Sequence, residues 1–244
     1  MLVLRPRRSI PRLQGSWYSA RCHIGADLCS DVEDDLFPPE IRTLSEVEVR
    51  PGGSSPLLLR RDLLEVTLVL EGRLAIVDGL GSGEGRARGG VHVANYGAGL
   101  ALRRFNESMQ DPARFLRVCL PRGENGSSAL SVWGSHDAEF QDRDAFQAVM
   151  LPVVDDIDAN SPGSEAQMAI SCGRIRPNLD VVHLFPKDSA GYLVLINGSA
   201  QVSTENDEGT VDAGGACGFI GETSFTIRTR SQKAQVFLFS FRAG

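Results

Sequence analysis

Pro51–Gly85 reads PGGSSPLLLRRDLLEVTLVLEGRLAIVDGLGSGEG and is the most informative stretch of the chain. Its middle part, Leu63–Leu70, is nearly continuously apolar and rich in branched side chains, as is typical of a buried strand. Glu71 and Gly72 then supply a turn, and Arg73–Val77 resumes the strand pattern. The stretch therefore predicts a β-hairpin.

Short strand-like runs broken by glycine turns continue along the whole chain. They are Glu46–Val49, Val91–Asn95, Leu100–Phe105, Phe115–Leu120, Gln167–Cys172, Val181–Phe185, Tyr192–Ile196, Gly198–Ser203, Gly218–Ile220, Ser224–Thr229 and Ala234–Phe241. Many short strands with such punctuation indicate an all-β sandwich or barrel.

One hairpin pattern occurs twice in the chain. LVLEGRLAIV at Leu68–Val77 is matched by LVLINGSAQV at Leu193–Val202, and this similarity indicates a duplicated unit. The segment between the halves ends in the polar run DDIDANSPGS, so we place the boundary near Asn160. We expect residues 1–160 to form an N-terminal barrel with its linker and residues 161–244 to form a second, degenerate barrel.

Composition excludes several classes of function. The chain has 244 residues, 42% of them hydrophobic, and its net charge of −6 disfavours direct binding of nucleic acid. It has neither the apolar core of a signal peptide nor a run of about 20 apolar residues, so we expect a cytoplasmic protein without a membrane span. The five cysteines are widely spaced, without the pattern of a zinc site, and we expect most to be reduced.

Pro51–Gly85 and the later block GAGLALRRFN, Gly97–Asn106, resemble the conserved blocks of the pirin family, which includes pirin-like quercetinases. The resemblance runs from Gly15-Ser16-Trp17 through most of the chain. It implies a bicupin, with two antiparallel β-barrels of the jelly-roll type packed side by side. In the metal-binding members the N-terminal barrel holds a single metal.

The resemblance also implies where the metal ligands would lie. In metal-binding members, two histidines on one strand and a histidine and a glutamate on another point into the barrel, and these positions fall on Leu58, Arg60, Leu102 and Arg104. Leucine has no lone pair, and arginine is a permanent cation without an acceptor. We therefore expect no metal and no other cofactor, as in the YhaK-like branch of the family, whose metal site is also altered.

The sequence leaves open how the two arginines are neutralised. A gapless match puts Leu64 at the position of a family glutamate, whereas the spacing from Gly72 selects Glu65, and either could face the pocket. If Glu65 points inward, it could pair with Arg60. If it points outward, the arginines need another partner. Arg60 and Arg104 could bind an anion or carboxylate inside the barrel, with Leu58 and Leu102 as an apolar wall; alternatively, their side chains reach the barrel mouth and pair with surface acids such as Asp62 or Glu107.

Cys119 lies on a strand expected to border the cavity. Nearby arginines could lower the pKa of its thiol and make it redox-responsive, whereas a buried structural cysteine would be inert. We therefore expect a metal-free protein that binds a small acidic molecule or anion, with a regulatory role. The alternative is an oxidoreductase similar to quercetin 2,3-dioxygenase, although the sequence offers no replacement for the metal. The sequence identifies no protein partner.

Overall fold

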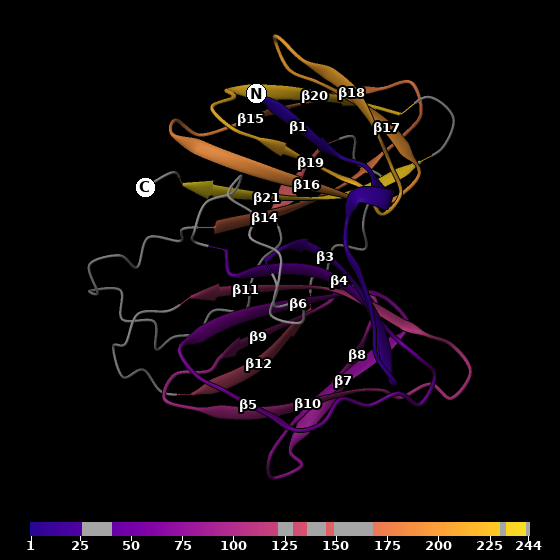
Figure 1. Ribbon diagram of the computed structural model, residues 1–244, viewed down its shortest axis with the longest axis vertical. Helices are drawn as coiled ribbons and strands as arrows, with labels where there is room; N and C mark the ends of the chain where they lie inside the picture. The colour runs from indigo at the N-terminus through magenta and orange to yellow at the C-terminus, as the bar shows by residue number, and fades with distance from the viewer. Residues whose placement is uncertain (26–40, 122–128, 136–144, 149–167, 230–232, 243–244) are drawn as a thin grey trace. The chain divides into compact units, whose positions relative to one another are not determined.

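The computed structural model describes residues 1–25, 41–121, 129–135, 145–148, 168–229 and 233–242 (Figure 1). The boundary expected near Asn160, together with Cys29 and the acidic residues around it, lies outside these ranges. The described residues form two compact units. One contains residues 11–25, 41–121 and 129–135, and the other contains residues 1–10, 145–148 and 168–242 with the gap at 230–232.

The first unit, which we call the N-terminal barrel, consists of two antiparallel sheets, coloured indigo to magenta in Figure 1. A seven-stranded sheet has the order β12-β9-β6-β11-β4-β3-β2, and a four-stranded sheet has the order β5-β10-β7-β8. Their strands are β2 (Arg12–Gln14), β3 (Tyr18–Ile24), β4 (Thr43–Val49), β5 (Leu58–Arg60), β6 (Leu63–Glu71), β7 (Arg73–Asp78), β8 (Gly83–Ala87), β9 (Gly90–Asn95), β10 (Leu100–Asn106), β11 (Ala113–Pro121) and β12 (Leu130–Ser135).

The second unit, the C-terminal barrel, has a six-stranded sheet of order β1-β19-β16-β21-β14-β13 and a four-stranded sheet of order β15-β20-β17-β18. Its elements are β1 (Leu2–Arg5), the 3-10 helix η1 (Arg7–Ser9), β13 (Gln147–Ala148), β14 (Met168–Ile175), β15 (Asp180–Leu184), β16 (Ser189–Asn197), β17 (Ser199–Ser203), β18 (Glu208–Asp212), β19 (Ala216–Phe219), β20 (Ser224–Arg228) and β21 (Ala234–Arg242). The first strand of the chain thus belongs to this barrel, where Leu2 pairs with Phe219.

The two barrels have the same strand order. The run β9-β6-β11-β4 in one large sheet corresponds to β19-β16-β21-β14 in the other, and β5-β10-β7-β8 corresponds to β15-β20-β17-β18. Apart from β1, which lies beside β19 as β12 lies beside β9, each strand of the second barrel therefore matches the strand numbered ten lower in the first. The duplication predicted from the two similar hairpins is seen in the strand order of both barrels.

The matching hairpins turn at equivalent glycines. Gly72 between β6 and β7 has φ +71°, and Gly198 between β16 and β17 has φ +82°, a region that side chains with a Cβ rarely adopt. A Cβ at Gly72 would also lie 2.5 Å from the carbonyl oxygen of Pro112. Both turns therefore require glycine, which is why the repeated pattern keeps it.

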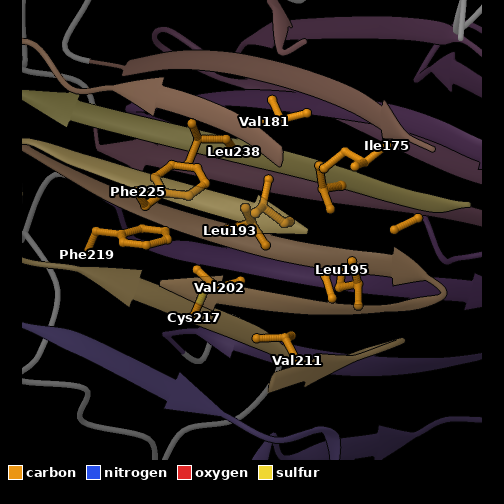
Figure 2. Packing of buried hydrophobic residues seen from close by; sticks show 14 of the residues in the cluster. Ile175, Val181, Leu193, Leu195, Val202, Val211, Cys217, Phe219, Phe225 and Leu238 are labelled. Atoms are coloured by element: carbon orange, nitrogen blue, oxygen red, sulfur yellow. The ribbon is translucent and has the colours of Figure 1, made fainter. Parts of the chain in front are cut away.

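The interior of the C-terminal barrel is apolar (Figure 2). Leu193, Cys217 and Phe225 are among the buried members of its core cluster, and the rings of Phe219 and Phe225 stack with centroids 4.3 Å apart. The core cluster of the N-terminal barrel draws on both sheets, for example on Phe115 of β11 and Leu102 of β10. Burial of these side chains is the main stabilising contribution in each unit.

Every strand-like run read from the sequence coincides with a strand, within a few residues at each end. The sequence did not predict several short strands, including β2, β8 and β18, because runs of three to five residues carry little periodicity. No described helix has the length and apolar character needed to span a membrane.

Candidate functional site

The inner face of β5 and β10 carries the four positions that the family resemblance assigned to metal ligands. Leu102 and Arg104 are only 1% and 3% exposed, and Leu58 and Arg60 are half-buried. Leu102 pairs in register with Leu58, so the two strands present these side chains together. Arg103, between two inward positions, is exposed and donates from Nε to Ser54 Oγ at 2.7 Å, as strand alternation requires.

Glu65 of β6 faces into the N-terminal barrel, which resolves the alternative left open by the sequence. Glu65 has no exposed surface, and its neighbours two residues along in each direction, Leu63 and Thr67, are buried as well. Leu63 and Val69 belong to the core cluster, so the odd-numbered residues of β6 point inward and Leu64 points to the opposite face.

Glu65 is held by side chains from both sheets. Arg104 Nη2 of the small sheet donates to Glu65 Oε1 in a close ion pair and to Tyr96 Oη at 3.1 Å. Within the large sheet, Arg117 Nε lies 3.3 Å from Glu65 Oε2. Tyr96 Oη and Thr67 Oγ1 each donate to the Glu65 carboxylate at 3.4 Å. This network, the Glu65 cluster, joins the two sheets inside the barrel.

Charge sets the protonation states of the Glu65 cluster. Burial alone would raise the pKa of Glu65, but the guanidiniums of Arg104, Arg117 and Arg60 outweigh it and lower this pKa to about 2. Burial and the Glu65 carboxylate raise the pKa of Tyr96 to about 12. At neutral pH the cluster therefore contains a carboxylate, guanidiniums and a neutral phenol.

Two buried arginines pair with the carboxylate of Glu65. Arg104 and Arg117 are 3% and 5% exposed. Among the described residues of this barrel, Glu65 is the one buried acid on the same inner face. The other buried acid, Glu46, lies on the opposite face of β4, where it pairs with Arg21 and Arg114. Moreover, Arg104 Nε is buried without a hydrogen-bond partner. Among the described residues, this Nε–H donor of Arg104 is therefore left without an acceptor.

The structure changes the pairing expected for the two arginines in two ways. Glu65 forms a close ion pair with Arg104, which the sequence had not singled out as its partner, while Arg60 is near enough to lower the pKa of Glu65. Glu107, considered as a surface partner, pairs with Arg73 instead. Arg104 therefore does not reach the barrel mouth.

Arg117 and Tyr96 were not recognised in the sequence as members of the site. Arg117 lies two residues before Cys119 on β11, so the alternation used for Cys119 could have placed both on the inner face. Tyr96 follows the end of β9, where no period predicts the direction of a side chain. Its contact with Arg104 depends on the packing of the two sheets.

His92 and Trp133 extend the polar interior along β9 and β12. They are register partners, and their rings meet edge to face with centroids 4.8 Å apart. His92 Nε2 lies 2.7 Å from Ser131 Oγ, whereas His92 Nδ1 and Trp133 Nε1 are buried without partners. Burial, with the charge of Arg104, lowers the pKa of His92 to about 3, so this imidazole is neutral.

Cys119 does border the Glu65 cluster, and its Sγ lies 3.7 Å from Glu65 Oε2. The sequence suggested that arginines could activate the thiol, but burial and the adjacent carboxylate outweigh Arg117 and raise its pKa. Burial also raises the pKa of Cys172 to about 11. The described cysteines are all buried and none forms a disulfide, so none has the exposure of a reactive thiolate.

The C-terminal barrel shows that the fold does not require an internal ion pair. His183 of β15 pairs with Phe225 of β20 and contacts Phe146 and Phe185, and no buried arginine or acid lies among the described residues of this core. One fold therefore encloses an apolar interior in one unit and a charged interior in the other. The charges of the N-terminal barrel are a property of its sequence rather than of the architecture.

The donor set does not fit the metal that the family resemblance implies. Leu58 and Leu102 offer no lone pair, and the cationic side chains of Arg60 and Arg104 would repel a metal ion. Within the described part of the chain, no three His, Cys, Asp or Glu side chains gather closely enough to hold a metal ion. Arg104 instead brings a positive charge of its own against Glu65.

No protein-family model matches the chain. Two curated proteins are 24% identical to it, and both are named as candidate quercetin 2,3-dioxygenases. The protein from Pseudomonas aeruginosa aligns over 204 residues, 83% of this chain and 85% of its own length. The protein from Zymomonas mobilis aligns over 239 residues, 98% of this chain and 97% of its own length.

Several solved structures share the fold. The nickel(II) complex of bacterial pirin YhhW from Escherichia coli superimposes with a TM-score of 0.78 at 16% identity and covers both chains completely. YhaK from Escherichia coli gives 0.63 at 15% identity over 83% of this chain and 86% of its own. Quercetin 2,3-dioxygenase from Acinetobacter baumannii gives 0.72 at 11% identity over 99% and 85%. With the duplicated strand order, these similarities show that the chain has a bicupin fold similar to those of bacterial pirin and quercetin 2,3-dioxygenase.

Proposed function

We propose that this bicupin works without a metal and binds a small carboxylate or inorganic anion inside its N-terminal barrel, as a binding or regulatory protein. The observation that carries the proposal is Arg104, whose buried guanidinium faces Glu65 and Arg117 while its Nε donor has no partner. A buried N–H of a cation that lacks an acceptor favours an anion beside it, because an unsatisfied buried donor is costly. An anion that accepts from Arg104 Nε would supply the missing acceptor.

A purely structural role for the Glu65 cluster explains its buried arginines less well than an anion-binding role does. A buried ion pair is often no more stabilising than apolar side chains of the same volume. The C-terminal barrel achieves the same fold with Val181, Phe225 and Ile227 in its interior. Selection for stability alone therefore does not account for Arg104 and Arg117, whereas recognition of an anion does.

Calorimetric titration with sulfate and with benzoate tests the proposal. We expect at least one probe to bind the unaltered protein, and to bind the double variant Glu65→Gln/Arg104→Met roughly 10-fold to 100-fold more weakly, the range of a charged hydrogen bond. The double variant removes one charge of each sign and so avoids a new buried imbalance. Arg103→Met is the matched control, because Arg103 is the exposed neighbour of Arg104. Equal affinity in the double variant and the control would refute the site.

A second candidate function is dioxygenase activity on quercetin. It is favoured by the names of the two curated relatives and by the fold shared with a quercetin 2,3-dioxygenase. The donor set at Leu58, Arg60, Leu102 and Arg104 argues against it. Elemental analysis of purified protein and an aerobic quercetin assay with added iron, nickel or copper distinguish the two. Stoichiometric metal with turnover would overturn the metal-free proposal.

A further inference from the structure

We infer that the ligand of the N-terminal barrel is a carboxylic acid with an apolar body and a hydroxyl group, and that Trp133 and His92 bind this hydroxyl. The inference rests on the proposed anion site and adds a second point of recognition to it. The combination of carboxylate, apolar body and hydroxyl is that of a hydroxylated aromatic acid.

Two buried polar atoms without hydrogen-bond partners mark the place where the ligand hydroxyl would bind. Trp133 Nε1 and His92 Nδ1 are both buried, and neither has a hydrogen-bond partner, although most buried polar groups in folded proteins have one. The two rings are in contact, with centroids 4.8 Å apart, and the inference places one small group of the ligand beside both nitrogens. This orphaned pair lies on β9 and β12, at one side of the large sheet.

A hydroxyl fits this pair better than a second carboxylate. The indole nitrogen of Trp133 can only donate, so the ligand atom beside it must accept. His92 is neutral, and its Nδ1 either accepts or donates, depending on which nitrogen carries the proton. A hydroxyl can accept from Trp133 and exchange a hydrogen bond with His92 in either tautomer, without bringing a second negative charge.

The orphaned pair is connected to the Glu65 cluster. His92 pairs in register with Thr67, whose hydroxyl donates to Glu65, and the charge of Arg104 acts on the pKa of His92. Both points of recognition therefore belong to one continuous inner surface. The spacing of neighbouring strands and residues puts them several ångströms apart, which is the scale of a benzene ring and its substituents.

Apolar side chains line the region around the two polar points. Leu102 is buried in the core cluster, and Leu100 and Trp133 pack against that same cluster while remaining partly exposed. Leu58 lies beside Leu102 in register. An apolar body would contact these side chains, whereas sulfate or acetate would leave them unused.

The test compares benzoate with 3-hydroxybenzoate and 4-hydroxybenzoate in calorimetric titrations. We expect one of the hydroxybenzoates to bind about fivefold more tightly than benzoate, the value of one neutral hydrogen bond. Trp133→Phe keeps a ring but removes the N–H, so it should lose this advantage and retain its affinity for benzoate. Trp17→Phe is the matched control and should keep the advantage.

Fluorescence gives a reading that does not depend on the folding of the Trp133 variant. The chain has two tryptophans, so Trp133 is the single tryptophan of the Trp17→Phe protein. Its emission should change on addition of the favoured hydroxybenzoate with the same midpoint as the calorimetric titration. An unchanged emission at saturation would overturn the inference.

The outcomes separate this inference from the proposed function. If benzoate or sulfate binds in an Arg104-dependent way, but the hydroxybenzoates show no advantage or keep it in Trp133→Phe, the inference is wrong and the anion site stands. If neither sulfate nor any benzoate binds the unaltered protein, the anion site itself is refuted.

Discussion

Replacement of Glu65 by glutamine should destabilise the N-terminal barrel more than replacement of its partner Arg104 by methionine. Glu65→Gln removes the carboxylate that the buried guanidiniums of Arg104 and Arg117 share. Arg104→Met leaves Glu65 with Arg117, whose Nε lies 3.3 Å from the carboxylate. The double variant Glu65→Gln/Arg104→Met removes one of the two buried arginines as well. Its free energy of unfolding should therefore decrease less than that of Glu65→Gln.

The magnitude follows from the pKa of Glu65. Lowering this pKa from 4.5 to about 2 corresponds to about 3 kcal/mol at 1.36 kcal/mol for each tenfold change in acidity. Breaking a buried ion pair by removing one partner costs a similar amount, about 3–5 kcal/mol. With a urea m-value of about 1–3 kcal/mol/M, the Glu65→Gln midpoint should fall by roughly 1–3 M.

Tryptophan fluorescence is suited to this measurement because Trp17 and Trp133 both lie in the N-terminal barrel. Its urea transition therefore reports that unit, while Cys217→Ser in the C-terminal barrel provides a control substitution in the other unit. A Glu65→Gln midpoint equal to that of the unaltered protein would refute the assignment of charge in the cluster. So would a larger loss in Arg104→Met than in Glu65→Gln.

Three further predictions concern pH, packing and thiol chemistry. The pKa of His92 is lowered to about 3 in the folded protein, whereas it is about 6.5 in the unfolded chain. The neutral imidazole therefore contributes fully to stability above about pH 6.5, and this contribution is lost as the pH falls toward about 3. Urea midpoints followed by fluorescence should decline over this range, and a flat profile would contradict the prediction. Gly191→Ala should cost about 1–3 kcal/mol, because its Cβ would lie 2.5 Å from the Phe185 ring; an unchanged thermal midpoint by circular dichroism would show that the ring moves freely. Cys119 should give no sulfenic acid adduct after mild peroxide treatment of the folded protein and should react once urea exposes it; mass-spectrometric detection of the adduct in the folded protein would restore the redox role.

The sequence predicted the architecture because the strand periods and glycine turns are local signals. Leu63–Leu70 and Tyr192–Ile196 are long enough to show a buried strand, and Gly72 and Gly198 mark their turns. The placement of β1 beside β19 was not predicted, because a strand of four residues, Leu2–Arg5, contains no sequence pattern that indicates which strand it pairs with. Pairing between distant strands depends on the assembled sheet.

The inner positions of the site were also accessible to sequence reasoning, whereas its contacts were not. Alternation from the family blocks placed Leu58, Arg60, Leu102 and Arg104 on one inner face, as the structure does. The close contact of Arg104 with Glu65 depends on how two sheets meet. No spacing within a single strand contains that information.

The pairing of β1 with β19 has a consequence for synthesis on the ribosome. The backbone N–H of Leu2 donates to Asp207 Oδ2 across 205 residues of sequence. At roughly 5–20 residues per second, β1 waits on the order of 10–40 s between its own translation and that of its partners. The N-terminal barrel lies between them in the chain and can begin to fold during this interval. A nascent chain stalled once residue 135 has left the ribosomal exit tunnel should therefore show protease protection of β3 to β11 while Leu2–Arg5 is still open to cleavage.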